Sequence, residues 1–261
     1  MNLRIKKLIK ELESLKKLGV VGIKQSFEDE GALFDDVLKM RTISAHAGVN
    51  LSVKIGGCEA ITDINNCLVI GADSLVAPMI ESKFALKKYI ESLKSNLTSG
   101  QQKDMKFYIN IESKAAYENL ESILDSKFSK NLTGIVVGRS DLTKSYGLSK
   151  RDVNYSKKIE DIVEDIFIKA KEKKMITLMG GSVGSASVNF IKKMLKNDVL
   201  DFVETRNVII DLKKINIKEL NHLVKSALIF ESEWLKFKAD FYYQISSPLL
   251  ARSKSILDRI S

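Results

Sequence analysis

Two acidic residues stand where two successive apolar runs end. Glu112 closes the run "KFYINIE", and Asp141 comes shortly after the run "GIVVG". If these runs are neighbouring parallel strands, both carboxylates lie at the same end of the sheet. Two carboxylates with water in the remaining positions suit Mg²⁺ or Mn²⁺, which prefer oxygen ligands. The same two residues are also explained as caps of the helices that follow, where acidic side chains are common.

An earlier segment repeats the arrangement around Glu112. The segment "APMIESKFALKKYIESL" (77–93) reads as an apolar strand, then Ile-Glu-Ser-Lys, then an amphipathic helix, and so does "KFYINIESKAAYENLESIL" (106–124). The two copies are separated by the length of one strand–helix unit. This repetition indicates an architecture that places its chemistry at the ends of strands.

Short apolar runs alternate with helical patterns along most of the chain. Helices are expected near 34–47, 60–70, 83–95, 115–125, 152–173 and 186–196, and strands at 20–27, 51–57, 74–80, 106–111, 133–139, 175–181 and 201–208. The strands are apolar throughout rather than alternating, as in a parallel sheet that helices cover. No GxGxxG follows the first strand, so an open dinucleotide-binding sheet has no support.

Polar residues end many of these strands, which favours a closed barrel over an open sheet with one switch point. We therefore predict an α/β fold, a (β/α)₈ TIM-type barrel, although only seven strands are recognised and the eighth is not located. No linker divides residues 1–261, so one domain is expected, with a barrel core at about 20–211. An N-terminal helix spans 3–17. A long C-terminal helical extension at about 214–261 either packs across the barrel end or makes an oligomer contact, and we expect a homo-oligomer.

Composition narrows the class of protein. The net charge is +9, but lysines are interleaved with acids along the predicted helices, which argues against a nucleic-acid partner. No apolar run is long enough for a membrane span. The N-terminus is a charged amphipathic helix rather than a signal peptide, which favours a cytoplasmic protein without membrane attachment. Cys58 and Cys67 lack metal-binding spacing and are expected to be free thiols.

Several motifs together resemble one enzyme family. "INIESKAAYENLESIL" followed by "GIVVGRSDLTKSYGL" resembles the HpcH/HpaI aldolase and citrate lyase β-subunit family, of the phosphoenolpyruvate/pyruvate-type TIM-barrel superfamily. That family has a strand ending in "IET" and then a "Gly-x-x-Asp-Leu" motif. "VAPMIES" is similar to another of its strands. "VGIKQSFEDEGA" and "SVKIGGCEA" resemble a branch associated with surface-polysaccharide gene sets, and the likeness runs over roughly 20–207.

The resemblance implies a divalent metal, Mg²⁺ or Mn²⁺, held by Glu112 and Asp141 rather than by Glu81 of the earlier copy. It also implies a carbon–carbon lyase of the class II pyruvate aldolase type. Such an enzyme joins or splits a 2-oxo acid enolate and an aldehyde, which could be sugar-derived. A metal chelated by the substrate would stabilise the enolate oxygen without a covalent lysine.

Other residues are candidates for catalysis. Lys54 stands where the family usually carries an arginine beside the keto oxygen, and it keeps the positive charge but not the planar fork. The base is less clear from the sequence: Glu28 or Glu30, in the cluster "SFEDEG", or a metal-bound water could accept the proton. His46 and His222 do not follow strands and are expected to be structural.

Candidates for substrate binding come from three places. Lys24 lies within the first strand. Lys24 and Lys54 are also each explained as rim lysines that bury their aliphatic stem and extend the charged amine to water, without contacting substrate. The turn "MGGSVGSAS" contains Gly180, Gly181 and Ser182, whose backbone N–H groups could hold a carboxylate or phosphate, although a tight turn needs the same glycines. Arg139, like Arg206, could reach an anionic substrate tail.

Two other functions fit the same residues. One is a citrate-lyase-β-like enzyme acting on a CoA thioester, which needs a nucleotide groove that no sequence feature identifies. The other is a non-catalytic barrel that binds an anionic sugar or a protein partner. It is favoured by the lysine at position 54 and by the lack of a histidine on an early loop, where some class II aldolases of the family carry a histidine–aspartate pair.

Overall fold

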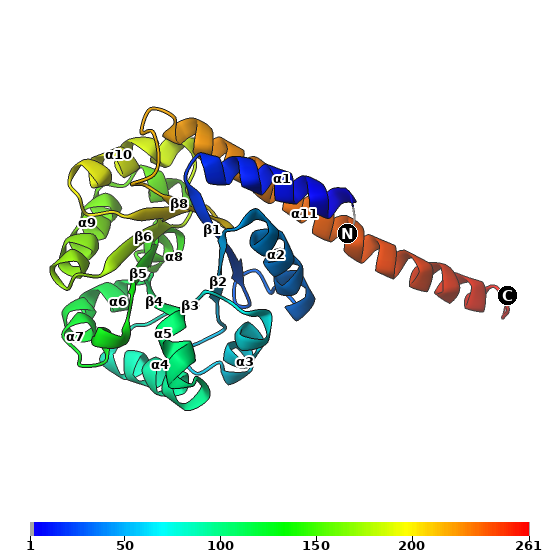
Figure 1. Ribbon diagram of the computed structural model, residues 1–261, viewed down its shortest axis with the longest axis horizontal. Coiled ribbons are helices and arrows are strands. Elements are labelled where there is room, and N and C mark those ends of the chain that lie inside the picture. The colour runs from blue at the N-terminus through cyan, green and yellow to red at the C-terminus, as the bar shows by residue number, and fades with distance from the viewer. Residues whose placement is uncertain (1–2, 261) are drawn as a thin grey trace.

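Eight strands form a closed barrel in chain order, and helices surround it (Figure 1). The computed structural model describes residues 3–260. The strands are β1 Val20–Ser26, β2 Asn50–Lys54, β3 Ser74–Ala77, β4 Lys106–Ile111, β5 Gly134–Gly138, β6 Ile176–Gly180, β7 Phe202–Glu204 and β8 Val208–Asp211. The predicted TIM-type barrel with a long C-terminal helix is thereby confirmed.

The helices follow the strands on the outside of the barrel. They are α1 Leu3–Lys17, α2 Phe34–Ala47, α3 Ile61–Ile70, α4 Lys83–Asn96, α5 Ser99–Asp104, α6 Lys114–Glu118, α7 Leu120–Leu124, α8 Arg139–Ser145, α9 Lys157–Glu172, α10 Val188–Lys196 and α11 Leu220–Leu257. Short 3₁₀ turns are η1 Ser129–Asn131, η2 Lys150–Asn154 and η3 Ser185–Ser187.

Alternation along the strands creates two separate apolar layers. In β4, Phe107, Ile109 and Ile111 belong to the main core between barrel and helices. Tyr108, between them, faces the barrel interior in a smaller cluster with Val76, Val136 and Leu178. Because side chains alternate along a strand, the interior face of β4 continues from Tyr108 to Asn110 and then Glu112. The strand thus delivers a carboxylate to the barrel mouth.

The eighth strand runs against the direction of its neighbours. Strands β1 to β7 pair in parallel, whereas β8 is antiparallel to both β7 and β1. The predicted strand at 201–208 is in fact β7, a tight loop at 205–207 and the first residue of β8. No helix separates β7 from β8, so the loop 205–207 lies at the same end of the barrel as the other strand ends.

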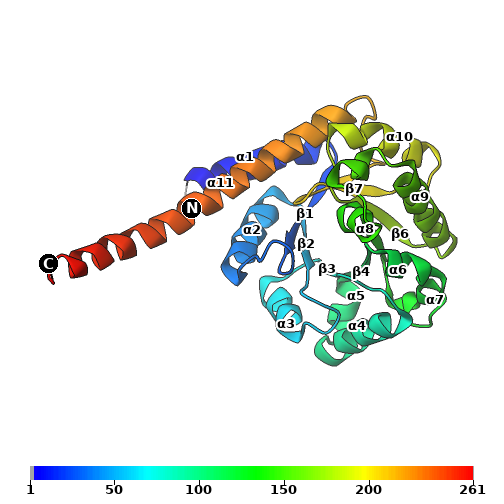
Figure 2. The ribbon, with the colours of Figure 1, turned by 180° about the vertical axis from the view of Figure 1, so that it is seen from behind.

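Helix α11 begins at the base of the barrel and rises towards its mouth. Asp211, at the end of β8, donates its N–H to the carbonyl of Gly19, which precedes β1. Twenty residues further on, Glu231 of α11 accepts the N–H of Asn207 in the loop at the mouth. Helix α1 runs antiparallel beside α11, linked by the Lys7–Glu233 ion pair at 3.0 Å (Figures 1 and 2).

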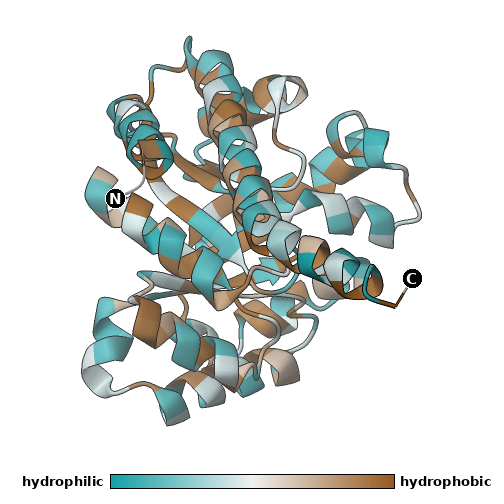
Figure 3. Cartoon of the chain, turned by 90° about the vertical axis from the view of Figure 1, so that its right-hand side faces the viewer, coloured by the Kyte–Doolittle hydropathy of each residue, from teal (hydrophilic) through white to brown (hydrophobic). Residues whose placement is uncertain are grey.

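The second part of α11 leaves the body of the molecule. Its last anchor is Tyr242, whose hydroxyl donates to the buried Asp36 of α2 at 2.8 Å. Beyond that point the helix projects past the barrel, and hydrophobic residues continue along it (Figures 1 and 3). Within residues 3–260, no helix is both long and apolar enough to cross a bilayer.

Candidate active site

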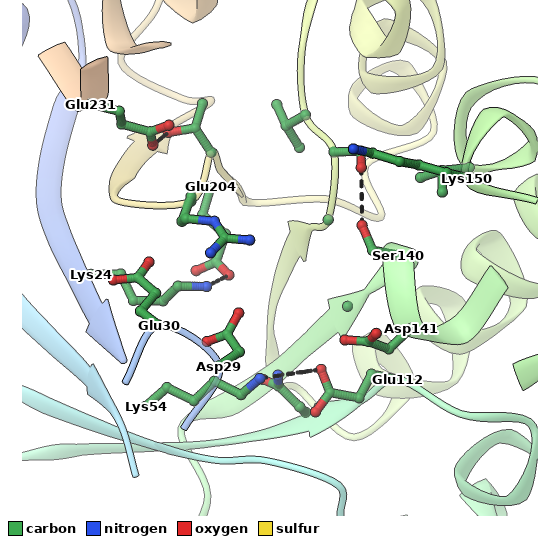
Figure 4. Close-up of a pocket in the computed structure, with 18 of the residues that line it drawn as sticks. Lys24, Asp29, Glu30, Lys54, Glu112, Ser140, Asp141, Lys150, Glu204 and Glu231 are labelled. Carbon is green, nitrogen blue, oxygen red and sulfur yellow. Dashed lines mark hydrogen bonds and ion pairs between the residues drawn. The ribbon is translucent and has the colours of Figure 1, made fainter. Parts of the chain in front are cut away.

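A pocket of about 620 Å³ opens at the C-terminal ends of the strands (Figure 4). Residues from β1, β2, β4, β5 and β7, from α8 and η2, and from the neighbouring loops line it, together with Leu228 and Glu231 from α11. Many of the side chains that line this pocket are charged. Those from the predictions that line it are Lys24, Glu30, Lys54, Glu112, Asp141, Gly181, Ser182 and Arg206.

Glu112 is buried at the floor of this pocket, with a residue exposure of 3%. One carboxylate oxygen, Oε1, accepts the N–H of Met79 at 3.1 Å, and Oε2 accepts the side-chain amide of Asn110 at 2.7 Å. Burial raises the pKa of Glu112, while Lys54, Asn110 and the Met79 N–H oppose that rise. The negative charge of Asp141 raises the pKa further, so the two acids interact electrostatically.

Glycine on the neighbouring strand makes room for this carboxylate. A Cβ at Gly138, the last residue of β5, would lie 2.5 Å from Oε2 of Glu112 and 2.9 Å from its Cβ. Such distances are too short for any real contact. Gly138 therefore allows Glu112 to occupy the barrel mouth.

Asp141 lies in the first turn of α8 and is half exposed. Its carboxylate pairs with Lys144 of the same helix at 3.0 Å. Figure 4 shows Asp141 and Glu112 on the same side of the pocket, with their carboxylates towards the same space. The structure thus brings the two predicted metal ligands together.

The donor set fits a hard divalent cation. Besides the two carboxylates, Oδ1 of Asn110 is buried, lines the same pocket and accepts no hydrogen bond in the described part of the chain. Within residues 3–260, no group of three or more His, Cys, Asp and Glu could hold a metal ion. An ion here would therefore keep several waters, which is the usual behaviour of Mg²⁺ and not of structural zinc.

Lys54, at the end of β2, is buried and lies between two carboxylates. Its Nζ is 2.7 Å from Oε2 of Glu28 and 3.6 Å from Oε2 of Glu112. Burial alone would lower the pKa of Lys54, but the charges of Glu112, Glu28 and Asp29 outweigh burial and raise it. The side chain therefore remains a cation at the pocket floor. Glu28 is used in this pair and is not part of the pocket lining.

A second lysine–glutamate pair, with a part-buried lysine and a buried glutamate, lies at the mouth. Lys24 of β1 pairs with Glu204 at the end of β7, and Figure 4 shows this pair above the Lys54–Glu112 pair, with Asp29 and Glu30 between them. A Cβ at Gly180 would lie 2.7 Å from Oε1 of Glu204, so this glycine has the same spatial role as Gly138. Sequence reasoning missed Glu204, although its place as the last residue of an apolar run was a usable signal.

Glu30 lies on the loop between β1 and α2 and points into the pocket (Figure 4). Its two oxygens accept the side-chain amide of Asn207 at 3.0 and 3.3 Å. Burial raises the pKa of Glu30 to about 7, and the charge of Asp29 adds to the rise. The backbone N–H of Asn207 donates in turn to Glu231 of α11. The sequence did not predict Glu231 as a site residue, because it is distant in sequence from Asn207.

Arg139 serves the scaffold rather than the pocket. It is 1% exposed and does not line the cavity. Its guanidinium donates to the carbonyls of Gly180, Gly181 and Val153, and also to side chains of Asn154 and Ser187. Burial lowers its pKa to about 10. The Arg139 side chain therefore links α8 to η2 and to the turn after β6. Gly180, another predicted substrate-binding residue, does not line the pocket either.

The turn after β6 does reach the pocket. Gly181 has a φ of +79°, and a Cβ there would lie 2.5 Å from the backbone nitrogen of Ser140. Glycine is therefore needed for this close approach. The Ser182 hydroxyl lies 3.0 Å from that of Ser140 across the pocket wall.

Three residues that the sequence set apart from the chemistry lie outside the pocket lining. Glu81 accepts the hydroxyl of Ser113, which caps α6. Through this bond Glu81 holds Ser113, the residue that follows Glu112. His46 bonds to the carbonyl of Thr42 within α2, and His222 lies on α11 near α1.

Solved structures share this architecture at low sequence identity. An HpcH/HpaI aldolase from Desulfitobacterium hafniense DCB-2 aligns with a TM-score of 0.57 at 13% identity, over 74% of this chain and 88% of that one. The citrate synthase SbnG gives 0.58 at 14%, over 89% and 99%. The protein CitE from Mycobacterium tuberculosis, in complex with magnesium and acetate, gives 0.50 at 13%, over 81% and 86%. These likenesses establish the fold.

Sequence comparison establishes the family. No curated protein matches the chain. Residues 36–184, more than half of the chain, match the family described as HpcH/HpaI aldolase/citrate lyase. That segment includes Glu112 and Asp141 and the strands β4 and β5 that precede them. The chain belongs to the HpcH/HpaI aldolase/citrate lyase family.

Proposed function

We propose that this protein is a divalent-metal-dependent carbon–carbon lyase that joins or splits a 2-oxo acid and an aldehyde. The observation that carries the proposal is the meeting of Glu112, Asp141 and the Lys54 cation in one pocket. Family membership supports a lyase in general, and the magnesium complex of CitE supports a metal of this type. Mg²⁺ or Mn²⁺, held by Glu112 and Asp141, would supply positive charge where an enolate oxygen develops.

The chain's own residues have separate tasks in this reaction. Lys54, held as a cation, adds positive charge beside the 2-oxo acid, and preorganised charge in a site with little water is effective. Asn110 and the Met79 N–H fix the Glu112 carboxylate in one orientation. The polar wall formed by Ser140, Gly181 and Ser182 suits an aldehyde with hydroxyl groups, such as a sugar-derived one.

Positive side chains at the rim suggest an acidic second substrate. Arg206 and Lys150 both line the pocket and are exposed. We propose that they receive an anionic tail of the aldehyde, and that the enzyme works in the cytoplasm. We also propose a homo-oligomer, because α11 exposes Tyr243, Leu249 and Leu250 beyond its last anchor.

The test is exchange of the pyruvate methyl protons with D₂O, followed by NMR. We expect exchange with Mg²⁺ or Mn²⁺ and none with EDTA. Glu112→Gln and Asp141→Asn should each lower the rate by about 10²-fold or more, since each removes part of the charge-stabilising site. Glu81→Gln is the matched control, because it changes the equivalent residue of the preceding strand and should keep the rate. Exchange by the EDTA-treated protein, or none by the metal-loaded protein, would contradict the proposal.

A further inference from the structure

The carboxylates around the pocket differ in what already holds them. Glu28 and Glu112 pair with Lys54, Glu204 pairs with Lys24, and Asp141 pairs with Lys144. Glu231 accepts both the Thr205 hydroxyl and the Asn207 N–H. In the described part of the chain, only Asp29 and Glu30 among the acids lining the pocket have neither an ion pair nor such a pair of fixed donors.

Glu30 is nevertheless held in place, by a neutral group. Asn207 is 2% exposed, and its side-chain amide bonds to both Glu30 oxygens and to the carbonyl of Lys24 at 3.1 Å. Its backbone N–H bonds to Glu231. An amide fixes the position of a carboxylate without adding the full positive charge that would keep it ionised. Glu30 is thus both oriented into the pocket and able to change its protonation state.

We propose that Glu30 is the general acid–base of the reaction and that Asn207 is its positioning residue. The inference rests on the proposed function. The Glu30 carboxylate takes a proton from the methyl carbon of the 2-oxo acid. The C–H electron pair forms the enolate double bond, and the carbonyl π pair moves to the keto oxygen. As the keto carbonyl re-forms, the enolate double-bond pair makes the new bond to the aldehyde carbon. The aldehyde π pair moves to the aldehyde oxygen, and Glu30 returns the proton to that oxygen.

The charges around Glu30 fit this task. Burial and the charge of Asp29 raise its pKa to about 7, against the lowering effects of Lys24, Arg206 and the Asn207 amide. A base is most useful when its pKa lies near the working pH. For Asp29, burial would raise the pKa, but the Ser26 hydroxyl with the charges of Lys54, Lys24 and Arg206 lowers it instead. Asp29 is therefore a weaker base than its neighbour.

The pH profile of pyruvate exchange tests the assignment. In the wild type the rate should rise as pH increases through about 7, because only the ionised Glu30 accepts a proton. Glu30→Gln should lower the rate by about 10²- to 10⁴-fold and abolish this rise. Asp29→Asn is the informative partner variant. Removing the neighbouring negative charge lowers the pKa of Glu30, so the midpoint of the profile should move to lower pH.

Chemical rescue separates catalysis from a structural role. Glu30→Ala creates space in the pocket, and added formate should restore part of the exchange rate in that variant. Pyruvate binding, measured by calorimetry with Mn²⁺, should persist in Glu30→Gln. An unchanged rise with pH in Glu30→Gln, an unmoved midpoint in Asp29→Asn, or a lack of rescue would overturn the assignment. Those results leave the metal-dependent exchange intact, whereas failure of the proposed function removes exchange from the wild type.

Discussion

At the scale of single residues, the barrel mouth contains two lysine–glutamate pairs whose glutamates are buried, each beside a glycine. Gly138 gives room to Glu112, which faces Lys54, and Gly180 gives room to Glu204, which pairs with Lys24. A buried charge is tolerated only with a partner and hydrogen bonds, so neither member of a pair can be removed alone without cost. The two glycines are therefore needed for the glutamates to reach their lysine partners.

The substitution Gly138→Ala tests this role. Its methyl group would overlap the carboxylate and Cβ of Glu112, which Asn110 and Met79 hold in place. We expect a loss of about 1–3 kcal/mol in the free energy of unfolding, measured in urea, and a clear loss of exchange activity. Gly184→Ala is the matched control, because no atom lies within 4 Å of its added methyl and its φ is not positive. Equal stability of the two variants would show that the mouth is less constrained than this geometry implies.

The sequence predicted those site residues whose position follows from strand order. Lys54 ends a strand, and Glu112 and Asp141 each come shortly after one, so their meeting at one rim depends only on the barrel. Arg139 follows a strand too, but its side chain turns into the scaffold, and the direction of a side chain in a first helical turn cannot be read from spacing. Glu231 could not be predicted, because its contact with Asn207 depends on how the chain returns after β8.

At the scale of elements, the β7–β8 hairpin determines one side of the pocket. Its loop carries Thr205, Arg206 and Asn207 to the mouth, and Glu231 of α11 fastens it there. Periodicity located β7, but the run 201–208 contains no Gly-containing turn signal that would divide it. The eighth strand was therefore missed, and so were the short helices α5 and α8, although the other strands and the longer helices follow from apolar patterning.

The fastening of the hairpin should show in the pH dependence of stability. Burial raises the pKa of Glu231, against the donors Asn207 and Thr205 and the charges of Lys24 and Arg206. A carboxyl whose pKa is raised on folding stabilises the protein below its unfolded pKa of about 4.3, and that contribution is lost as pH rises through the folded value. The stability of the wild type relative to Glu231→Gln should therefore decline as pH rises above about 4.3 in urea unfolding.

Glu233 provides the control on the same helix. It is exposed, and bonds to Lys236 and Lys7 lower its pKa to about 2. Its contribution is lost only as pH falls through that lower range, so the Glu233→Gln difference should stay constant between about pH 5 and about pH 8. If the stability difference between the wild type and Glu231→Gln is also constant over this pH range, burial does not raise the pKa of Glu231, and this prediction is wrong.

At the scale of the whole molecule, α11 has an anchored and an unanchored part. Up to Tyr242 it packs on α1, α2 and the hairpin, with Trp234 and Phe230 buried. Beyond it, Leu249, Leu250 and Leu257 are 64%, 69% and 59% exposed. Leu250 and Leu257 stand one heptad apart, so they share a stripe of the helix. Such an apolar stripe on a projecting helix favours contact between chains.

Shortening the chain to end at Gln244 tests this use. The barrel should stay folded, because the removed residues are mostly exposed, and circular dichroism should show loss of helix signal alone. Sedimentation should show the full-length chain as an oligomer and the shortened chain as a monomer. Leu249→Ser with Leu250→Ser should act like the truncation, and Ser255→Asn, on the polar side, should not. A full-length monomer would exclude this role of α11.

The reversal of β8 has a consequence for how this scaffold can diversify. A parallel eighth strand would release the chain at the mouth and send the last helix back to the base, far from the pocket. The antiparallel β8 releases the chain at the base instead, and α11 climbs to the mouth, where Glu231 enters the pocket wall. Lengthening or reshaping the tail therefore alters access to the pocket without any insertion into a barrel loop. In evolutionary terms, the strand reversal makes the segment that follows β8 a place where substrate range can change while the barrel is left untouched.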